Sequence, residues 1–275
     1  MHKSSLKFLT LTTLTMALAL SGCSSNSSTP GASANASESH LTKILKTKTV
    51  RIGVIPDGPP WGVVDASGNR QGFDIDAANA LGKALGSKVV FISSTNESRI
   101  PLLQTNKADV MVAALTATNA RAQSVEMTIP YAAGGQVIML PKGSPIKSYA
   151  DLDGKTISTT RGSIGDTVLE SRFPKAKATK FDSIADAIQA LRSHKVDALI
   201  ESNSVVPLLV KANPGTWAQL DAPQLNPSLV SFGVQQGDQL WLNYLNNFVR
   251  NYNISKEADA SYEKWLGGPV PDMIK

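Results

Sequence analysis

The chain has 275 residues, a formal net charge of +5 and a single cysteine, and 42% of its residues are hydrophobic. It is therefore long enough and apolar enough to form one large or two medium domains with a real core. A lone cysteine excludes an internal disulfide. A positive charge this small and this scattered does not indicate nucleic-acid binding, which needs Lys and Arg gathered on one face.

The first 23 residues have the features of an export signal. Lys3 and Lys7 precede a mostly apolar stretch at 8–20, which is too short to span a membrane. Leu20-Ser21-Gly22-Cys23 matches the lipobox of bacterial lipoproteins, in which the cysteine is lipidated and becomes the mature N-terminus. We expect lipidation at Cys23 and attachment to a bacterial membrane, facing the periplasm or the cell exterior. The alternative is an ordinary secretory signal with an incidental thiol.

Residues 24–39 form a second distinct segment, which is small and polar. Such a segment cannot bury enough apolar surface to fold, so it predicts a disordered tether. No stretch after the tether is long and apolar enough to be a transmembrane helix.

Short apolar strands alternate with amphipathic helices along the remaining chain. The stretches 50–55, 89–92 and 110–115 are expected to be strands, and the wholly apolar run at 110–115 is expected to be covered on both faces. Gly72-Phe73-Asp74-Ile75-Asp76 opens a helix, and its two carboxylates are expected to stabilise the helix dipole. This β-α-β-α order predicts an α/β sheet that binds its ligand beyond the carboxyl ends of the strands, where Thr116 would lie.

Several groups near this edge are suited to a small anion. Thr118 to Arg121 is expected to start a helix, whose free N–H groups attract anions, and a guanidinium grips a carboxylate with two parallel hydrogen bonds. Arg99, just before a turn expected at 100–104, would bring a second guanidinium to Thr116 and Arg121. The alternative is that both arginines are solvated surface charges. Trp61, in a rigid proline loop, is expected to be either a wall of the site or a packed loop residue.

The second half of the chain contributes a glycine turn. Arg161-Gly162-Ser163-Ile164-Gly165 opens a helix, in which glycine lets a ligand approach the backbone and serine caps the helix. It is not Gly-x-Ser-x-Gly, so it predicts no serine nucleophile. No metal-binding cluster is present in the sequence pattern. No histidine is placed as a base, because His2 lies in the signal, His40 at the tether and His194 on a polar helix face.

Five segments stand in a fixed order: a proline-and-aromatic loop at 56–62, Gly72 to Asp76, Arg99-Ile100-Pro101-Leu102-Leu103-Gln104, Ala108-Asp109-Val110 and Thr116 to Arg121. Together they resemble the extracellular solute-binding proteins of ABC importers for polar amino acids, over about Lys46 to Val270. Two sequence motifs are most similar to the glutamate/aspartate-binding branch. One surrounds Arg99, and the other is Lys264-Trp265-Leu266 followed by Pro269-Val270-Pro271.

This resemblance implies a two-lobed periplasmic-binding-protein (Venus flytrap) α/β fold. Each lobe would be a mixed, mostly parallel sheet flanked by helices, with two crossings as a hinge. Residues 40–137 and 231–275 would form lobe 1, and residues 138–230 lobe 2. A monomer without a cofactor or metal would capture a polar amino acid, acidic ones included, or a related carboxylate, and deliver it to a membrane permease. A dehydratase-like enzyme of the same fold and a ligand-sensing surface lipoprotein are the alternatives.

The resemblance also implies roles for individual residues. Arg121 and Thr116 would hold the α-carboxylate of the ligand. Gly162 and Ser163 would add backbone and hydroxyl groups, and Arg99 would hold a side-chain carboxylate.

Some positions depart from the family pattern. Ser202 stands where an aspartate usually binds the ligand's ammonium group, while Gly58 and Asn96 stand where aromatic residues are common. We therefore expect Glu201 or Asp57 to supply the negative charge, unless the ligand is not an ordinary α-amino acid.

Overall fold

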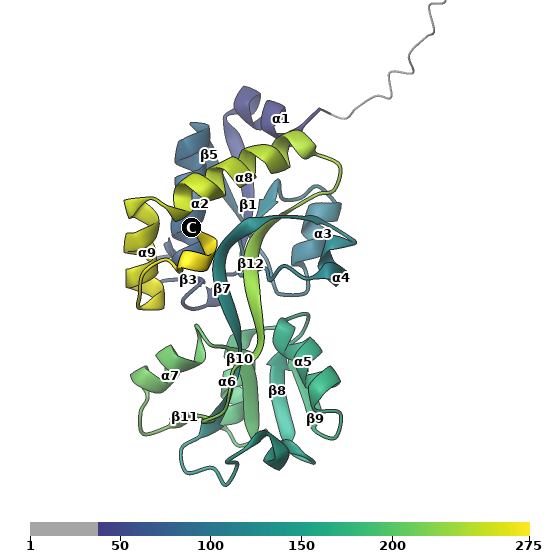
Figure 1. The fold of residues 1–275 in the computed structure, drawn as a ribbon, viewed down its shortest axis with the longest axis vertical. Helices are drawn as coiled ribbons and strands as arrows, with labels where there is room; N and C mark the ends of the chain where they lie inside the picture. Colours follow the sequence, from purple (N-terminus) through teal and green to yellow (C-terminus); the bar gives the residue numbers. More distant parts are fainter. Residues whose placement is uncertain (1–37) are drawn as a thin grey trace, which may run out of the picture. The chain divides into compact units, whose positions relative to one another are not determined.

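In the computed structural model, two long strands, β7 (Glu126–Pro141) and β12 (Leu225–Val234), run side by side and join two lobes (Figure 1). The structure describes residues 38–275. The predicted export signal, Cys23 and most of the predicted tether lie outside these described residues. None of the described helices is long and apolar enough to cross a membrane.

The first lobe contains α1 (His40–Thr47), β1 (Thr49–Val54), β2 (Asp57–Gly58), β3 (Gly62–Val64), β4 (Arg70–Gln71), α2 (Phe73–Leu85), β5 (Lys88–Ser93), α3 (Arg99–Gln104), β6 (Val110–Met111), α4 (Asn119–Ala122), α8 (Gln239–Asn253), α9 (Lys256–Leu266) and η2 (Asp272–Ile274). The second lobe contains η1 (Tyr149–Leu152), β8 (Thr156–Thr160), α5 (Ile164–Arg172), β9 (Lys177–Phe181), α6 (Ile184–Arg192), β10 (Ala198–Ser202), α7 (Val206–Ala212) and β11 (Trp217–Gln219).

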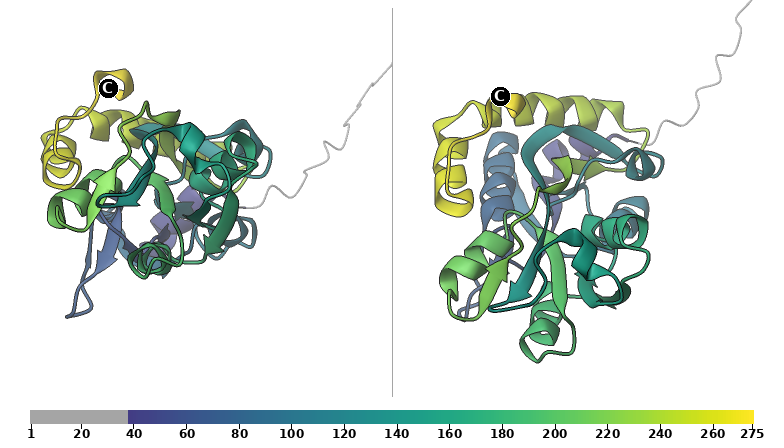
Figure 2. Two further views of the ribbon diagram at one scale, coloured as in Figure 1. Left: turned by 90° about the horizontal axis from the view of Figure 1, so that it is seen from below. Right: turned by 60° about the horizontal axis from the view of Figure 1, so that its bottom comes forward.

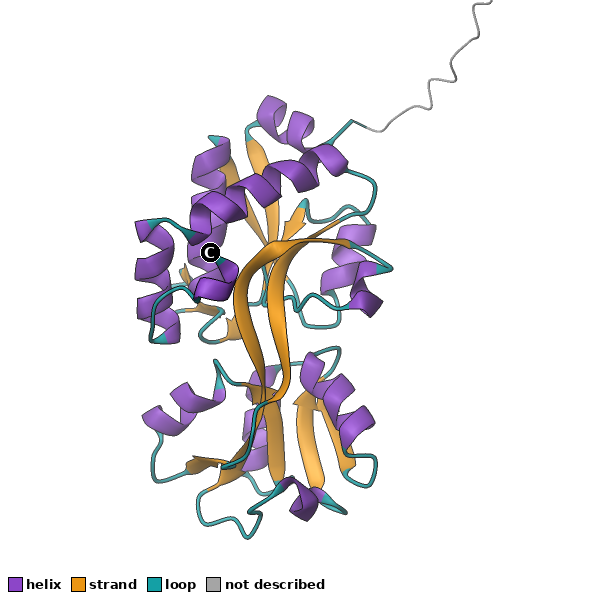
Figure 3. Cartoon of the chain, viewed as in Figure 1, coloured by secondary structure: helices purple, strands orange, loops and turns teal. Residues whose placement is uncertain are grey.

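One mixed sheet runs through both lobes in the order β5-β1-β6-β12-β7-β10-β8-β9, with β11 also paired to β7. Its two ends are parallel, whereas β12 and β7 are antiparallel to each other in the middle. Parallel strands need crossover connections, and helices here flank the sheet in each lobe (Figure 3). The α/β fold predicted from the sequence is confirmed.

Helices near the end of the chain return to the first lobe. α8 packs against β7, α1 and α2, and α9 packs against α2 and α8 (Figure 2). The apolar face of α8 supplies Trp241, Leu245 and Val249, which are fully buried in the core.

An aromatic cluster fixes the part of this lobe that borders the cleft. Phe73 stacks on Tyr131 with ring centroids 5.7 Å apart, and it meets Tyr262 edge-on at 4.8 Å. Trp61 adds a second edge-on contact to Phe73 at 5.6 Å. Each such pair contributes about 0.5–1.5 kcal/mol beyond its area burial, so the cluster holds the start of α2 against the middle of β7.

The third predicted strand is shorter than its apolar run. Residues 110–115 are all apolar, but only Val110–Met111 pair in β6, and Ala114 has a φ of 47°. The Asp74 carboxylate accepts a hydrogen bond from the Ala114 amide at 2.8 Å, which takes that amide out of the strand ladder. Thr116 then makes a single antiparallel bridge to β12.

Two other local expectations are wrong. Residues 100–104, expected as a turn, belong to helix α3. His40, expected at the tether, is the buried first residue of α1; its Nδ1 lies 2.8 Å from the Asp238 carboxylate and its Nε2 lies 3.0 Å from the Asn106 amide oxygen. Both partners are far away in sequence, so no local pattern could reveal them.

Candidate ligand-binding site

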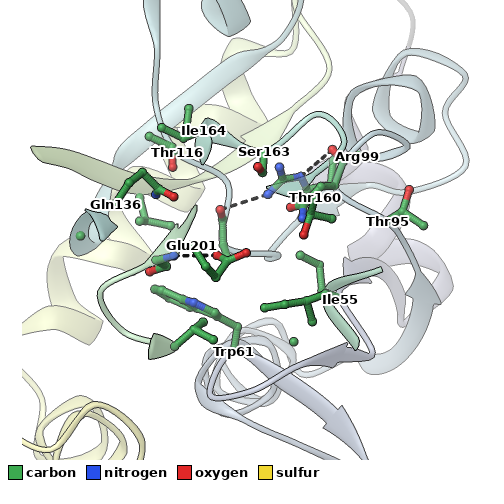
Figure 4. Close-up of a pocket in the computed structure, with 18 of the residues that line it drawn as sticks. Ile55, Trp61, Thr95, Arg99, Thr116, Gln136, Thr160, Ser163, Ile164 and Glu201 are labelled. Atoms are coloured by element: carbon green, nitrogen blue, oxygen red, sulfur yellow. Dashed lines mark hydrogen bonds between the residues drawn. The ribbon is translucent and has the colours of Figure 1, made fainter. Parts of the chain in front are cut away.

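A cavity lies between the two lobes and takes its walls from both (Figure 4). About 780 Å³ of space lies between these walls, including the space at the open side of the cavity. Eight of the ten predicted binding residues line it, namely Asp57, Trp61, Asn96, Arg99, Thr116, Ser163, Glu201 and Ser202. Arg121 and Gly162 lie beside the cavity rather than in its walls.

Arg99 is the cation in the cavity wall, and its side chain is held by backbone carbonyls. Its Nε donates to Asn96 at 3.0 Å, its Nη1 to Ala113 at 2.8 Å and to Ala114 at 3.0 Å, and its Nη2 to Gly162 at 3.4 Å. Arg99 is only 2% exposed. Within residues 38–275, no carboxylate lies within ion-pair distance of it. A buried guanidinium with neutral partners is suited to an anion in the cavity.

The charge of Arg99 persists at neutral pH. Burial, together with the neighbouring Arg121 guanidinium, lowers the pKa of Arg99 to about 9, while the Asp74, Tyr131 and Glu201 side chains oppose this decrease. Burial also lowers the pKa of Arg121, to about 10. Both guanidinium groups therefore stay positively charged at neutral pH.

Arg121 connects the two lobes. Its Nη1 donates to the Thr116 carbonyl and its Nη2 to the Gly162 carbonyl, both at 2.9 Å. Its own amide is not free, because the Thr118 hydroxyl accepts from it at 3.2 Å, and α4 has only four residues. The Arg121 amide is therefore not one of the free N–H groups expected at this helix start, and the positive charge of the segment lies on the guanidinium.

Gly162 is needed for the close approach of one lobe to the other. Its φ is +70°, and a Cβ there would lie 3.0 Å from the Cα of Glu97 in the first lobe. From the sequence, this glycine was expected to admit a ligand to the backbone, but its close neighbour is the backbone of the opposite lobe. Ser163 follows as the cap of α5, as predicted, and accepts from the Asp166 amide at 3.1 Å.

The two candidate acids differ in where they lie. Glu201 is the next-to-last residue of strand β10, and its Oε1 accepts a hydrogen bond from the Ser202 amide at 2.7 Å. Burial raises the pKa of Glu201, against the opposing effects of that amide and of Arg99. Asp57 is exposed at the edge of the cleft; desolvation still raises its pKa, and Asp186 raises it as well. Glu201 is therefore the carboxylate nearer the charged interior.

Thr160 is a cavity residue that the sequence analysis missed. Its side chain is 1% exposed, and its hydroxyl has no hydrogen-bond partner among the residues described. Gln136 on β7 and Ile184 at the start of α6 also line the cavity. Thr160 ends strand β8, so the rule that ligands bind beyond the carboxyl ends of strands could have identified it.

The sequence of this chain is similar to those of known proteins. Residues 50–268 match the family model of bacterial extracellular solute-binding proteins, family 3. The ABC transporter glutamine-binding protein of Bacillus subtilis (strain 168) is 29% identical over 263 residues, which cover 94% of this chain and 96% of that protein. A probable histidine-binding protein of Neisseria gonorrhoeae is 27% identical and covers 80% of this chain and 83% of its own length.

Solved structures agree in fold. The solute receptor for L-cysteine of Neisseria gonorrhoeae is 30% identical with a TM-score of 0.79, over 86% of this chain and 96% of that chain. An ancestral amino acid-binding protein, described as a precursor of cyclohexadienyl dehydratase, is 32% identical with a TM-score of 0.77, over 82% and 99%. The chain therefore belongs to the bacterial extracellular solute-binding proteins of family 3.

Proposed function

We propose that this protein binds a polar L-amino acid as a zwitterion between its lobes, acting as a monomer, and delivers it to an ABC permease. The observation that carries the proposal is the buried Arg99 guanidinium, which faces the cavity with only neutral carbonyl partners, while Glu201 lines the same cavity. Relatives named for glutamine, histidine and arginine binding support an amino acid as the ligand.

The site carries charges of both signs, as a zwitterion requires. Arg99 in the wall and Arg121 beside it supply two positive charges. Asp57, Asp182 and Glu201 line the same cavity, and Asp74 lies behind it. A ligand ammonium group would pair with Glu201, and a ligand carboxylate with Arg121 and Thr116. An acidic ligand adds a further negative charge, so it would bind together with a proton on Asp74 or Glu201, both of which have a raised pKa.

Calorimetric titration with glutamine, glutamate, aspartate, arginine, histidine and cystine tests this proposal, run beside an assay for chemical turnover of the same compounds. We expect stoichiometric binding of at least one amino acid without product. Product formation would instead support the dehydratase-like alternative, for which the ancestral relative is the specific precedent. If the protein binds an amino acid but cells that lack its gene take up that amino acid at the normal rate, a sensor would be supported instead.

We also propose that the lobes close by bending β7 and β12, with 40–137 and 231–275 in lobe 1 and 138–230 in lobe 2. Two features support a hinge there. The pairing register of the two strands shifts between Leu225 and Ser228, and the opposite strand carries Gly134 and Gly135.

Replacing Arg121 by alanine tests the proposed anchor of the α-carboxylate. Loss of one partner of a desolvated charge pair typically costs about 2–5 kcal/mol, so Arg121→Ala should weaken every amino-acid ligand by roughly 30-fold to several thousand-fold. The exposed Arg250 on α8 provides the control, and Arg250→Ala should bind normally. Titration calorimetry measures both, and near-normal binding by the Arg121 variant would remove it from the site.

Membrane anchoring is proposed from Cys23, the only cysteine of the sequence. Cys23→Ser removes the thiol that would carry lipid and changes nothing in residues 38–275. We expect this variant to leave the membrane fraction while it keeps the Kd of the unaltered protein. Fractionation followed by immunoblotting decides the matter, and a variant that stays in the membrane fraction would refute lipidation at Cys23.

A further inference from the structure

A buried carboxylate, Asp74, lies behind the cavity wall. It is the second residue of α2 and is 0% exposed. One of its oxygens accepts from the Ala114 amide at 2.8 Å, and the other accepts from the Tyr131 hydroxyl on β7 at 2.5 Å. Its place in the first turn of α2 suits the helix dipole, as expected from the sequence, but both of its hydrogen bonds reach outside α2.

The Ala114 bond links Asp74 to the binding site. Ala114 has a φ of 47°, a backbone conformation that is unfavourable for a residue with a Cβ and needs support from its surroundings. The carbonyls of Ala113 and Ala114 both accept from Nη1 of Arg99. Asp74 therefore holds the turn whose carbonyls hold the guanidinium.

We propose that Asp74 is a positioning residue: it fixes the Arg99 guanidinium through the Ala114 turn and compensates its charge, and so controls how strongly the site binds a ligand carboxylate. Only the last step of this inference, the control of carboxylate binding, rests on the proposed function. The positioning of Arg99 itself is a property of the chain without ligand.

A second carboxylate in the same turn of α2 provides the contrast. Asp76 accepts from the Ser261 hydroxyl at 3.0 Å and from the Trp265 indole N–H at 2.7 Å, and both of these partners lie on α9. Asp76 is not among the cavity residues. Two aspartates of one helical turn thus serve different tasks, one behind the site and one at the contact between helices.

The charge of Asp74 couples binding to pH. Burial raises the pKa of Asp74 to about 7, while the Tyr131 and Ala114 hydrogen bonds and the Arg99 charge pull it down. A ligand carboxylate at Arg99 would add a negative charge nearby and raise the pKa of Asp74 further. Protonated Asp74 then favours the anionic ligand, so affinity for L-glutamate should increase as pH falls through about 7.

Other charged and titratable groups surround this pair. They are Tyr131 on β7, Arg99 on α3, Tyr252 on α8, Tyr262 on α9, Asp76 on α2, and Arg121 and Glu201 near Arg99. The tyrosines stay neutral in this range because burial raises their pKa values. Glu201 would shift in the same direction as Asp74, so only a difference between variants isolates the contribution of Asp74.

The experiment compares Asp74→Asn, Asp74→Ala and Asp76→Asn with the unaltered chain. Nitrogen-15 NMR reports the solvent exchange of the Arg99 Nε–H without ligand, and Arg99→Lys identifies the signal. Calorimetry with L-glutamate and L-glutamine at about pH 6 and about pH 8 gives the pH dependence of affinity.

We expect Asp74→Ala to speed Arg99 exchange by about tenfold or more and to weaken binding by a similar factor. Asp74→Asn keeps an acceptor for Ala114, so it should retain slow exchange but lose most of the gain in L-glutamate affinity at low pH. Asp76→Asn should lower Tm and change neither readout.

The inference is overturned if Asp74→Ala lowers Tm but leaves Arg99 exchange and Kd unchanged, because Asp74 would then be structural only. It is also overturned if Asp74→Asn keeps the pH dependence of the unaltered protein. If neither amino acid binds, the proposed ligand is wrong, and the NMR exchange alone decides whether Asp74 positions Arg99.

Discussion

Arg99→Ala is expected to raise the Kd for the bound amino acid by at least about 100-fold and to lower Tm as well. The substitution removes the donors for the carbonyls of Asn96, Ala113 and Ala114, and it takes a positive charge away from Asp74. Removing one member of a buried charged network costs about 3–5 kcal/mol, since the remaining partners stay buried and unpaired. Calorimetry and thermal unfolding measure the two effects.

A lysine at the same position provides the matched control. Arg99→Lys keeps a positive charge but lacks the planar fork that meets several carbonyls at once, so binding should be partly retained. If Arg99 reads a side-chain carboxylate, Arg99→Ala should cost more affinity for L-glutamate than for L-glutamine. Equal losses of affinity for L-glutamate and L-glutamine would mean that Arg99 organises the site without binding the side-chain carboxylate. An unchanged Kd would contradict any role of Arg99 in ligand binding.

Gly162→Ala is expected to hold the lobes apart and to weaken ligand binding by about 10- to 100-fold, a cost of roughly 1.4–2.8 kcal/mol. A Cβ there would lie 3.0 Å from the Cα of Glu97, which is a backbone atom and cannot rotate away. The φ of +70° adds strain for any residue with a side chain. Small-angle scattering with saturating ligand should then show no decrease in the radius of gyration.

Gly154 offers a control with the same backbone strain and no clash. Its φ is +74°, and a Cβ there would meet no heavy atom within 4 Å. Gly154→Ala should therefore lose some stability but bind and close normally. If Gly162→Ala closes as the unaltered protein does, the contact between residues 162 and 97 does not limit closure.

Local sequence patterns predicted the elements of this fold well. The helix at Phe73–Leu85, the strand at Lys88–Ser93 and the capped helix at Ile164–Arg172 follow from apolar periodicity and from a serine cap. The same patterns failed at Ala114, because an apolar run cannot show that a carboxylate 40 residues earlier captures its amide. The strand therefore ends sooner than the run of apolar residues.

The candidate site was predictable where it follows the edge of the sheet. Arg99 and Ser163 stand at the starts of helices there, Thr116 follows the apolar run at 110–115, and all three line the cavity. Thr160 ends a strand at the same edge but lies in no distinctive motif, and only the structure shows that its hydroxyl has no hydrogen-bond partner within residues 38–275. The position of Arg121 beside the cavity likewise depends on Gly162 of the opposite lobe, which no local pattern reveals.

A crystal structure of the protein with the amino acid that binds tightest in the titration panel tests the central claim most directly. We expect the ligand between the lobes, with a carboxylate oxygen at about 2.7–3.2 Å from the guanidinium of Arg99 or Arg121, and with its ammonium group against Glu201. A ligand bound outside this cavity, or one whose carboxylate meets neither arginine, would contradict the account.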